Sequence, residues 1–107
     1  VNQVAAMAAG KGTILVCLDS NHTHDHVLEE LQLYSPFVTS GSYLVVFDTI
    51  IEDMPKGMYD RPWDVGNNAK TAVWKFLETN KGFEIDHMVD HKLLISVAPE
   101  GYLRCIR

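Results

Sequence analysis

Basic side chains are scarce in this sequence, which has 9 Lys and Arg residues against 14 Asp and Glu and a net charge of -5. Nucleic-acid surfaces need clustered Lys and Arg to neutralise phosphates, so we expect no nucleic-acid partner. Long apolar runs are also missing, because no stretch approaches the roughly 20 residues of a membrane span. The first ten residues carry no basic segment typical of a signal peptide. We therefore expect a cytoplasmic protein that makes no membrane contact.

Cysteine is nearly absent. The only two, Cys17 and Cys105, are far apart, which excludes a disulfide framework and a cysteine-rich zinc site. We expect both to be buried thiols. The apolar share of 47% supports a packed core, and 107 residues are enough for one domain of modest size.

The first half of the chain has the pattern of a βαβ unit. A buried strand is predicted over Thr13–Leu18, and its continuous apolar run suggests that both of its faces are covered. A helix follows, from His22 or Thr23 to about Tyr34, with its apolar residues at helical spacing. A second apolar strand spans Ser42–Phe47. Two such strands joined by one helix run parallel.

The second half opens with a long loop, Thr49–Asn67, which is rich in proline, glycine and aspartate and could form a lid. The clearest helix is Asn68–Asn80. A half-buried strand is predicted over Phe83–Val89 and a last buried strand over Leu93–Ala98, continuing extended over Tyr102–Ile106. We expect these last strands to form an antiparallel hairpin.

An aspartate follows each of the two parallel strands. Asp19 and Asp48 should lie at the same edge of the sheet, where open α/β sheets bind ligands. Hard cations such as Mg2+ take carboxylate oxygens and retain several waters, so two acids can suffice as protein ligands. The alternative is that each acid merely caps the helix or turn after its strand.

Three histidines alternate with other polar residues just after Asp19. His22 and His26 share a helix face if the helix has begun, and either could act as a general base at neutral pH. A zinc site would need a third ligand, and no HExxH pattern is present. His24 is most simply an exposed imidazole.

The two tryptophans have plainer explanations. Trp63 in the long loop could close over a flat substrate, but we favour packing of the loop onto the domain. Trp74 lies among the apolar residues of the second main helix and is expected in the core or an interface.

Four segments together resemble one family. Leu18–Val27 reads LDSNHTHDHV, Gly41–Val46 reads GSYLVV, Asp48–Thr49 follows, and Ala98–Leu103 reads APEGYL. This set is similar to the cephalosporin hydroxylase family, which also includes rhamnosyl O-methyltransferases of antibiotic pathways. The resemblance spans nearly all of the chain.

The resemblance implies a class I methyltransferase fold that binds S-adenosylmethionine, with Mg2+ held by acids at the ends of two strands. Asp19 corresponds to the first metal acid and Asp48 to the second. Where the family usually has Val-Val-Glu-Asp-Thr, this sequence has Val-Val-Phe-Asp-Thr, so Phe47 stands where another carboxylate is expected. Losing one acid should weaken Mg2+ binding.

The resemblance covers the C-terminal half of the family domain, with residues 1–107 as a single domain. The glycine-rich cofactor turn after the first strand of that domain and the acid that holds the ribose are not among these residues. The expected fold is α/β, a partial Rossmann-like methyltransferase sheet of about four strands and two main helices. Its expected strand order is first, second, fourth, third, with the last strand antiparallel. The strand Thr13–Leu18 then lies at an edge, so we expect a homo-oligomer.

Two functions remain open at this point. The favoured one is a truncated relative that does not transfer methyl groups by itself and serves as a self-associating module that binds a small molecule. The alternative is a metal-dependent O-methyltransferase acting on an antibiotic or sugar hydroxyl, completed by oligomerisation or a partner chain. In that case Asp19 and Asp48 bind the metal, and His22 or His26 assists deprotonation of the hydroxyl.

Overall fold

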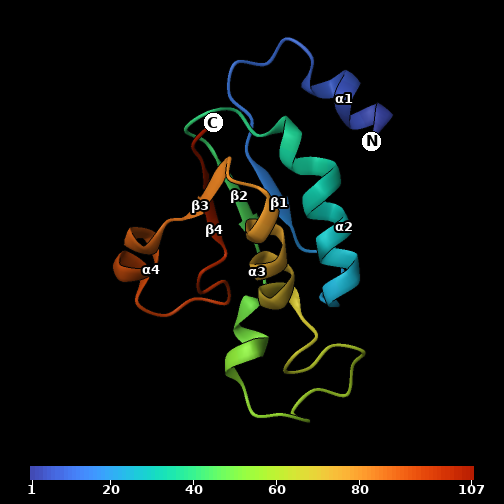
Figure 1. The fold of residues 1–107 in the computed structure, drawn as a ribbon, viewed down its shortest axis with the longest axis vertical. Coiled ribbons are helices and arrows are strands. Elements are labelled where there is room, and N and C mark those ends of the chain that lie inside the picture. Colours follow the sequence, from blue (N-terminus) through green and yellow to red (C-terminus); the bar gives the residue numbers. More distant parts are fainter.

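A four-stranded mixed sheet is the centre of the structure, a computed structural model that describes residues 1–107. The spatial order is β1 (Val16–Leu18), β2 (Tyr43–Val46), β4 (Tyr102–Cys105) and β3 (Phe83–Ile85). Strands β1 and β2 are parallel, and β4 is antiparallel to both of its neighbours (Figure 1). The predicted α/β class, the strand order and the antiparallel last strand are therefore confirmed.

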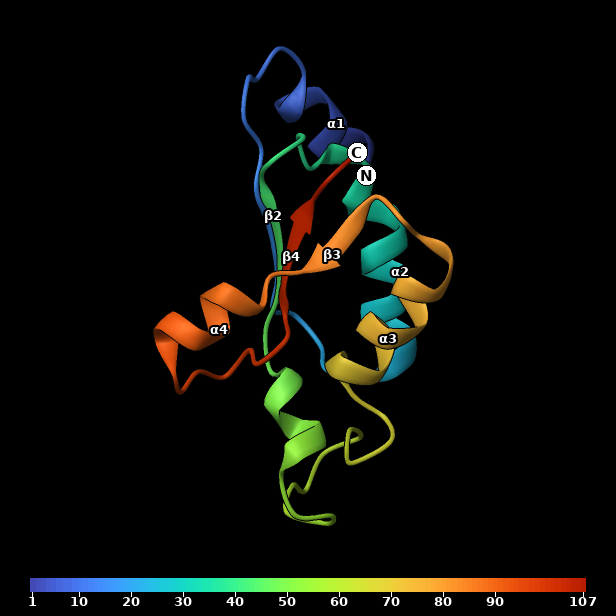
Figure 2. The same cartoon turned by 60° about the vertical axis from the view of Figure 1, so that its left-hand side comes forward.

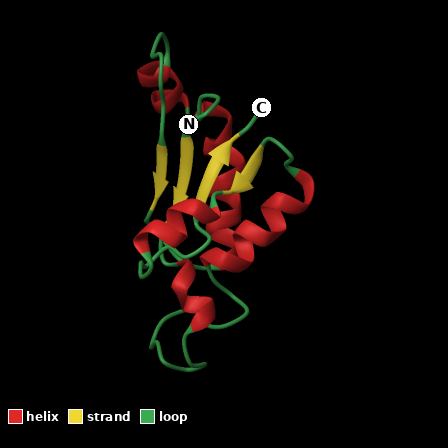
Figure 3. Cartoon of the chain, turned by 90° about the vertical axis from the view of Figure 1, so that its left-hand side faces the viewer, coloured by secondary structure: helices red, strands yellow, loops and turns green.

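The two main helices cover one face of this sheet. Helices α2 (His24–Tyr34) and α3 (Ala69–Thr79) pack side by side there, while α4 (His87–Leu93) lies on the opposite side of the sheet (Figure 2). Helix α1 (Asn2–Ala8) has no buried residue and lies at the end of the molecule where both termini are found (Figure 3). No helix is long and apolar enough to cross a bilayer.

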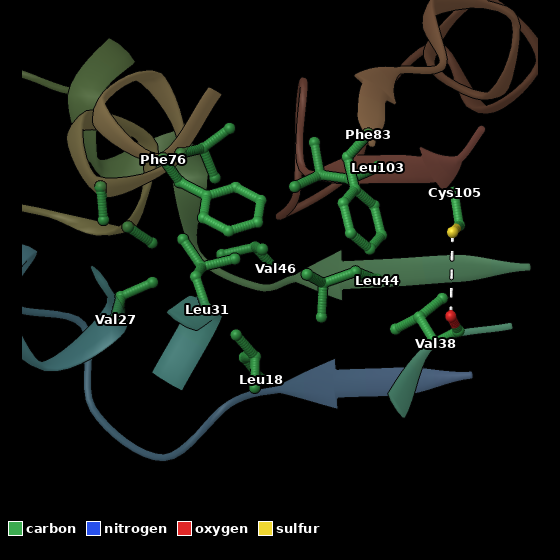
Figure 4. Close-up of a cluster of buried hydrophobic side chains, with 13 residues drawn as sticks. Leu18, Val27, Leu31, Val38, Leu44, Val46, Phe76, Phe83, Leu103 and Cys105 are labelled. Carbon is green, nitrogen blue, oxygen red and sulfur yellow. Dashed lines mark hydrogen bonds between the residues drawn. The ribbon is translucent and has the colours of Figure 1, made fainter. Parts of the chain in front are cut away.

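The core fills the space between the sheet and the pair of helices. Leu31 of α2, Leu44 of β2 and Leu103 of β4 are fully buried at its centre (Figure 4). Phe76 and Phe83 bring their rings to 5.8 Å and link α3 to β3. These are the alternate residues of each strand and the i, i+3, i+4 residues of each helix, which is why the sequence pattern identifies them.

The start of α3 has a specific polar signal. The Asn68 side chain accepts hydrogen bonds from the backbone N–H groups of Lys70 and Thr71, and the Thr71 hydroxyl oxygen accepts one from the Asn68 N–H. This reciprocal capping satisfies N–H groups that no helical carbonyl can reach. Pro36 falls in a short 3-10 turn, Ser35–Phe37, that continues α2. Both predicted main helices are thus confirmed to within two residues.

The first strand departs from the prediction. Only Val16–Leu18 is strand, and one of its faces is open, because Cys17 is exposed and Leu15 has 53% of its surface accessible. The expectation that both faces are covered was wrong, since α2 and α3 lie on one side only and α4 lies against β4. Cys17 is therefore not a buried thiol, whereas Cys105 is, and its Sγ lies 3.7 Å from the Val38 carbonyl oxygen.

The predicted strands over Phe83–Val89 and Leu93–Ala98 were also wrong in part. Strand β3 ends at Ile85, because Asp86 caps α4 by accepting a hydrogen bond from the Met88 N–H. The run after α4 is not a buried strand, since Leu94 and Ile95 are 85% and 89% exposed. β3 and β4 do pair antiparallel, but α4 lies in the connection.

Gly101 explains why the last strand starts where it does. The Val46 N–H donates to the Gly101 carbonyl at 2.8 Å, which sets the register of β4 on β2. A Cβ atom at position 101 would lie 2.3 Å from the Val46 carbonyl oxygen, closer than any side chain tolerates. The chain can approach β2 this closely only because position 101 has no side chain.

The long connection beyond β2 lies past the carboxyl ends of β1 and β2. It opens with a 3-10 helix, η2 (Thr49–Asp53), which the sequence did not predict, and continues irregularly to the start of α3 (Figures 1 and 2). Trp74 points out of α3 with 47% of its surface exposed, so it is not a core residue.

Candidate metal centre

Asp19 and Asp48 meet because their strands end together. Leu18 pairs with Val46 in the parallel ladder, and the Phe47 N–H donates to the Leu18 carbonyl at 3.1 Å. Asp48 then turns the chain with a left-handed backbone, φ 61°, into η2. Left-handed conformations are uncommon outside glycine, although aspartate tolerates them better than most residues. The two aspartates therefore leave the same edge of the sheet, as the sequence predicts.

His22 joins the two acids. Its Nε2 lies 2.8 Å from the Asp48 Oδ2, and one ligand atom each of Asp19, His22 and Asp48 all lie within 4.8 Å of one another. The imidazole is mostly covered, with 15% of its side-chain surface accessible, whereas Asp19 is exposed. This cluster, which we call the Asp-His-Asp cluster, is therefore a solvent-accessible group with one well-packed member.

The turn between β1 and α2 positions His22. The Asn21 side-chain oxygen accepts hydrogen bonds from the Thr23 N–H at 2.9 Å and from the Thr23 hydroxyl at 2.8 Å. The indole of Trp63 meets the His22 ring edge to face, at 4.8 Å between centroids and 79° between planes. Trp63 thus packs its loop onto the domain as expected, and the residue it packs against belongs to the cluster.

His26 lies in a separate polar group. Its Nε2 is 3.1 Å from the Ser20 hydroxyl and 3.4 Å from the Glu30 Oε1, and the Ser20 hydroxyl also donates to Glu30 at 3.0 Å. The imidazole is 44% exposed. The structure therefore brings His22, and not His26, against the two acids.

His24 ties the two main helices together. Its backbone N–H donates to the Asn67 side-chain oxygen at 2.8 Å, and its Nδ1 lies 2.8 Å from the Thr71 hydroxyl. The residue is half-buried, so the expectation of an exposed imidazole was wrong. Sequence reasoning missed this role because the partners are more than 40 residues away along the chain.

Lys70 is a second feature that the sequence analysis missed. It is the one buried charged residue, and its Nζ lies 2.8 Å from Asp53 and 3.9 Å from Glu100. A signal was present, because Lys70 lies three residues before Val73 and therefore on the apolar face of α3. The pair ties the first turn of α3 to the end of η2.

The donor chemistry of the Asp-His-Asp cluster is mixed. Two carboxylates offer oxygen, His22 offers nitrogen, and the Phe47 side chain between β2 and Asp48 offers no donor. Mg2+ prefers oxygen ligands and near-octahedral geometry, so this set suits it less well than three carboxylates do. Imidazole nitrogen is a better ligand for the later divalent transition metals.

Comparison of the sequence with known proteins points to one family. The family model described as "Rhamnosyl O-methyltransferase/CmcI" matches residues 1–106. Proteins named rhamnosyl O-methyltransferase from Mycobacterium tuberculosis and Mycobacterium bovis are each 46% identical over 44 residues, which is 41% of this chain and 18% of theirs. The Mycobacterium leprae protein of that name is 43% identical over 44 residues, 41% of this chain and 19% of its own length. The matched stretch thus spans less than a fifth of these relatives, and no solved structure matches the chain.

Proposed function

Because the chain belongs to the rhamnosyl O-methyltransferase/CmcI family, we propose that its 107 residues provide the metal-holding edge of a methyltransferase-type site. In this proposal the chain binds a divalent cation through Asp19 and Asp48 but does not transfer a methyl group by itself. The observation that carries it is the meeting of Asp19, Asp48 and His22 at the carboxyl ends of two parallel strands. In open α/β sheets this edge is where ligands bind.

The lack of a nucleotide-binding turn supports the second half of the proposal. The family depends on S-adenosylmethionine, which supplies the methyl group. Such cofactors are held by a glycine-rich turn that runs from a strand into a helix. The one Gly-x-Gly triplet of these residues, Gly10–Gly12, instead connects α1 to β1 and so precedes a strand. Neither end of that triplet offers a helix N-terminus to a ligand.

The two candidate histidines divide between two roles. His22 lies against the acids and acts at the cation. His26 is more exposed, and its Nε2 lies 3.1 Å from the Ser20 hydroxyl. If a complete site forms, His26 is the group that receives a hydroxyl proton.

We further propose that two copies of the chain associate through β1. This strand has a hydrogen-bonded neighbour on one side only, and it begins beside a shallow groove of about 360 Å3 between α1 and the segment before β1. Met7 and Leu15 in that groove are 76% and 53% exposed. An open edge beside apolar side chains favours pairing with another chain. Size-exclusion chromatography with light scattering should give a dimer or larger species at micromolar concentration, and a stable monomer would contradict this.

The second candidate function is an active O-methyltransferase in which a second copy or a partner chain completes the cofactor site. The position of Asp19 and Asp48 at one edge of the sheet favours it, because a metal-dependent methyl transfer needs acids in fixed positions to hold the metal. The names of the mycobacterial relatives suggest a sugar hydroxyl as the acceptor.

Isothermal titration with S-adenosylmethionine, with and without a divalent cation, separates the two. The main proposal expects heat from the cation and none from S-adenosylmethionine. Tight binding of S-adenosylmethionine to the chain alone would favour the active enzyme and overturn the main proposal.

A further inference from the structure

We propose that the Asp-His-Asp cluster takes a divalent transition metal, with the His22 imidazole as a direct ligand, in preference to Mg2+. This rests on the proposed function in one respect, which is that Asp19 and Asp48 hold the cation. It goes beyond it by assigning a nitrogen ligand and, through that ligand, the class of metal.

The distances within the cluster are close to those between ligands of one bound ion. Two adjacent ligand atoms on one six-coordinate ion at about 2.1 Å lie about 3 Å apart. The Nε2 of His22 and the Oδ2 of Asp48 are already 2.8 Å apart, and Asp19 brings an oxygen within 4.8 Å of both. A small movement of the exposed Asp19 side chain closes the third contact, while His22, the packed member of the cluster, keeps its position.

The cluster also has fewer carboxylates than the family pattern. Phe47 removes the carboxylate that the family pattern places beside Asp48, whereas the His22 nitrogen lies 2.8 Å from the Asp48 Oδ2. The cluster therefore offers two oxygens and one nitrogen. Mg2+ suffers most from the loss of a carboxylate, since it depends on hard ligands and ligand charge. Divalent manganese, iron, cobalt and zinc accept imidazole, with affinity that rises along this series in general.

Neighbouring residues hold His22 in place. Its ring is held edge to face by Trp63, and its turn is held by the two hydrogen bonds that Asn21 accepts from Thr23. A ligand whose orientation is fixed before binding loses little conformational freedom on coordination. This packing therefore favours metal coordination by His22 over a role as a surface partner of Asp48 alone.

The test is spectroscopic and uses the whole chain. The metal-free protein is titrated with Mn2+, Co2+ and Mg2+, and the Mn2+ complex is measured by pulsed electron paramagnetic resonance for coupling to a directly bound 14N nucleus. We expect 14N coupling in the wild type and at least about tenfold tighter binding of Mn2+ and Co2+ than of Mg2+. His22→Ala should abolish the coupling and weaken Mn2+ binding at least about tenfold.

Matched variants separate the possible outcomes. His91→Ala removes an exposed imidazole on α4 and should keep both the coupling and the affinity. Phe47→Glu should raise Mg2+ affinity relative to wild type, with circular dichroism used to confirm that each variant is folded. If Mn2+ and Mg2+ bind equally and no nitrogen is coupled, the inference fails while the metal role of Asp19 and Asp48 survives. If no cation binds, or if Asp19→Asn and Asp48→Asn leave binding unchanged, the proposed function itself fails. Should His22→Ala not fold, the wild-type 14N signal still decides.

Discussion

Lys70 shows how a single residue fixes two elements. Its ammonium group is buried, while Asp53 beside it keeps 51% of its side-chain surface exposed and Glu100 is farther away. Removing one partner of such a pair has unequal effects, because a charge left in the interior is costly and a charge left in water is not. We therefore expect the free energy of unfolding to fall more when Asp53 is removed than when Lys70 is replaced by an apolar residue.

We expect Asp53→Ala to lower the free energy of unfolding by about 1–3 kcal/mol, since it leaves the buried Lys70 ammonium without its nearest carboxylate. Lys70→Met fills nearly the same volume and should change it by less than about 1 kcal/mol. Urea denaturation followed by circular dichroism measures both. Lys75→Met is the control, because the Lys75–Glu78 pair is exposed and should contribute within about 0.5 kcal/mol. Equal losses for Asp53→Ala and Lys70→Met would refute the asymmetry.

Tyr43 and Asp86 form a second pair, on the sheet face that carries α4. The Tyr43 hydroxyl donates to the Asp86 Oδ2 at 2.6 Å. This hydrogen bond is the main cause that raises the pKa of Tyr43 and lowers the pKa of Asp86. A lowered carboxyl pKa contributes stability above its unfolded value, about 4, which is lost as the pH falls through the folded value. A raised phenol pKa contributes stability below about 10, which is lost as the pH rises through the folded value.

Tyr43→Phe should therefore flatten the dependence of stability on pH at both extremes. We expect the urea midpoint of the wild type to fall more steeply than that of the variant below about pH 4 and above about pH 10. Asp86→Asn should remove the same two dependences, and the double variant should add nothing further. Parallel wild-type and variant profiles would show that the hydrogen bond is not linked to folding.

At the scale of elements, Gly101 controls how β4 meets β2. We expect Gly101→Ala to destabilise the protein by about 3 kcal/mol or more, because its Cβ overlaps a backbone carbonyl that cannot move aside. Gly12→Ala is the control, since nothing lies within 4 Å of its Cβ, and it should change stability by less than about 0.5 kcal/mol. Thermal unfolding of the two variants makes the comparison. Similar melting temperatures for both would mean that β4 can shift its register.

The elements that the sequence predicts well are those whose pattern and burial agree. Helix α3 has apolar residues at i, i+3 and i+4 and an asparagine cap, so its limits were predictable. The run Leu93–Ala98 has the composition of a buried strand, but β4 occupies the place beside β2 that a last buried strand would take. That competition is a tertiary effect that local composition does not record.

The candidate site was predictable in its two acids and not in its third member. Parallel strands oblige Asp19 and Asp48 to meet, so topology alone places them. Which histidine joins them depends on the turn built by Asn21 and on the position of Trp63, a residue 41 positions beyond His22. A choice between His22 and His26 therefore needs coordinates.

At the scale of the whole molecule, a variant on β1 and one on α4 can show which of these two surfaces forms the interface between copies. Leu15 beside β1 is 53% exposed and Met88 on α4 is 60% exposed, so replacing either with lysine exchanges a similarly exposed apolar side chain for a charged one. We expect Leu15→Lys to shift the chain toward monomer, because a charge at an edge strand opposes pairing with another chain. Met88→Lys should leave the assembly intact. Analytical ultracentrifugation over a range of concentrations measures both, and the reverse result would place the interface on α4.

Strand β4 also sets the order in which the sheet can assemble. It comes after β3 along the chain but lies between β2 and β3 in space, and β3 has no other strand partner. The β1–α2–β2 unit can therefore form from local contacts, whereas β3 must wait until its later neighbour has docked. When the molecule is stretched in optical tweezers, β3 and β4 should accordingly unfold together in one cooperative step. The parallel pair of β1 and β2 should stay folded to a later step.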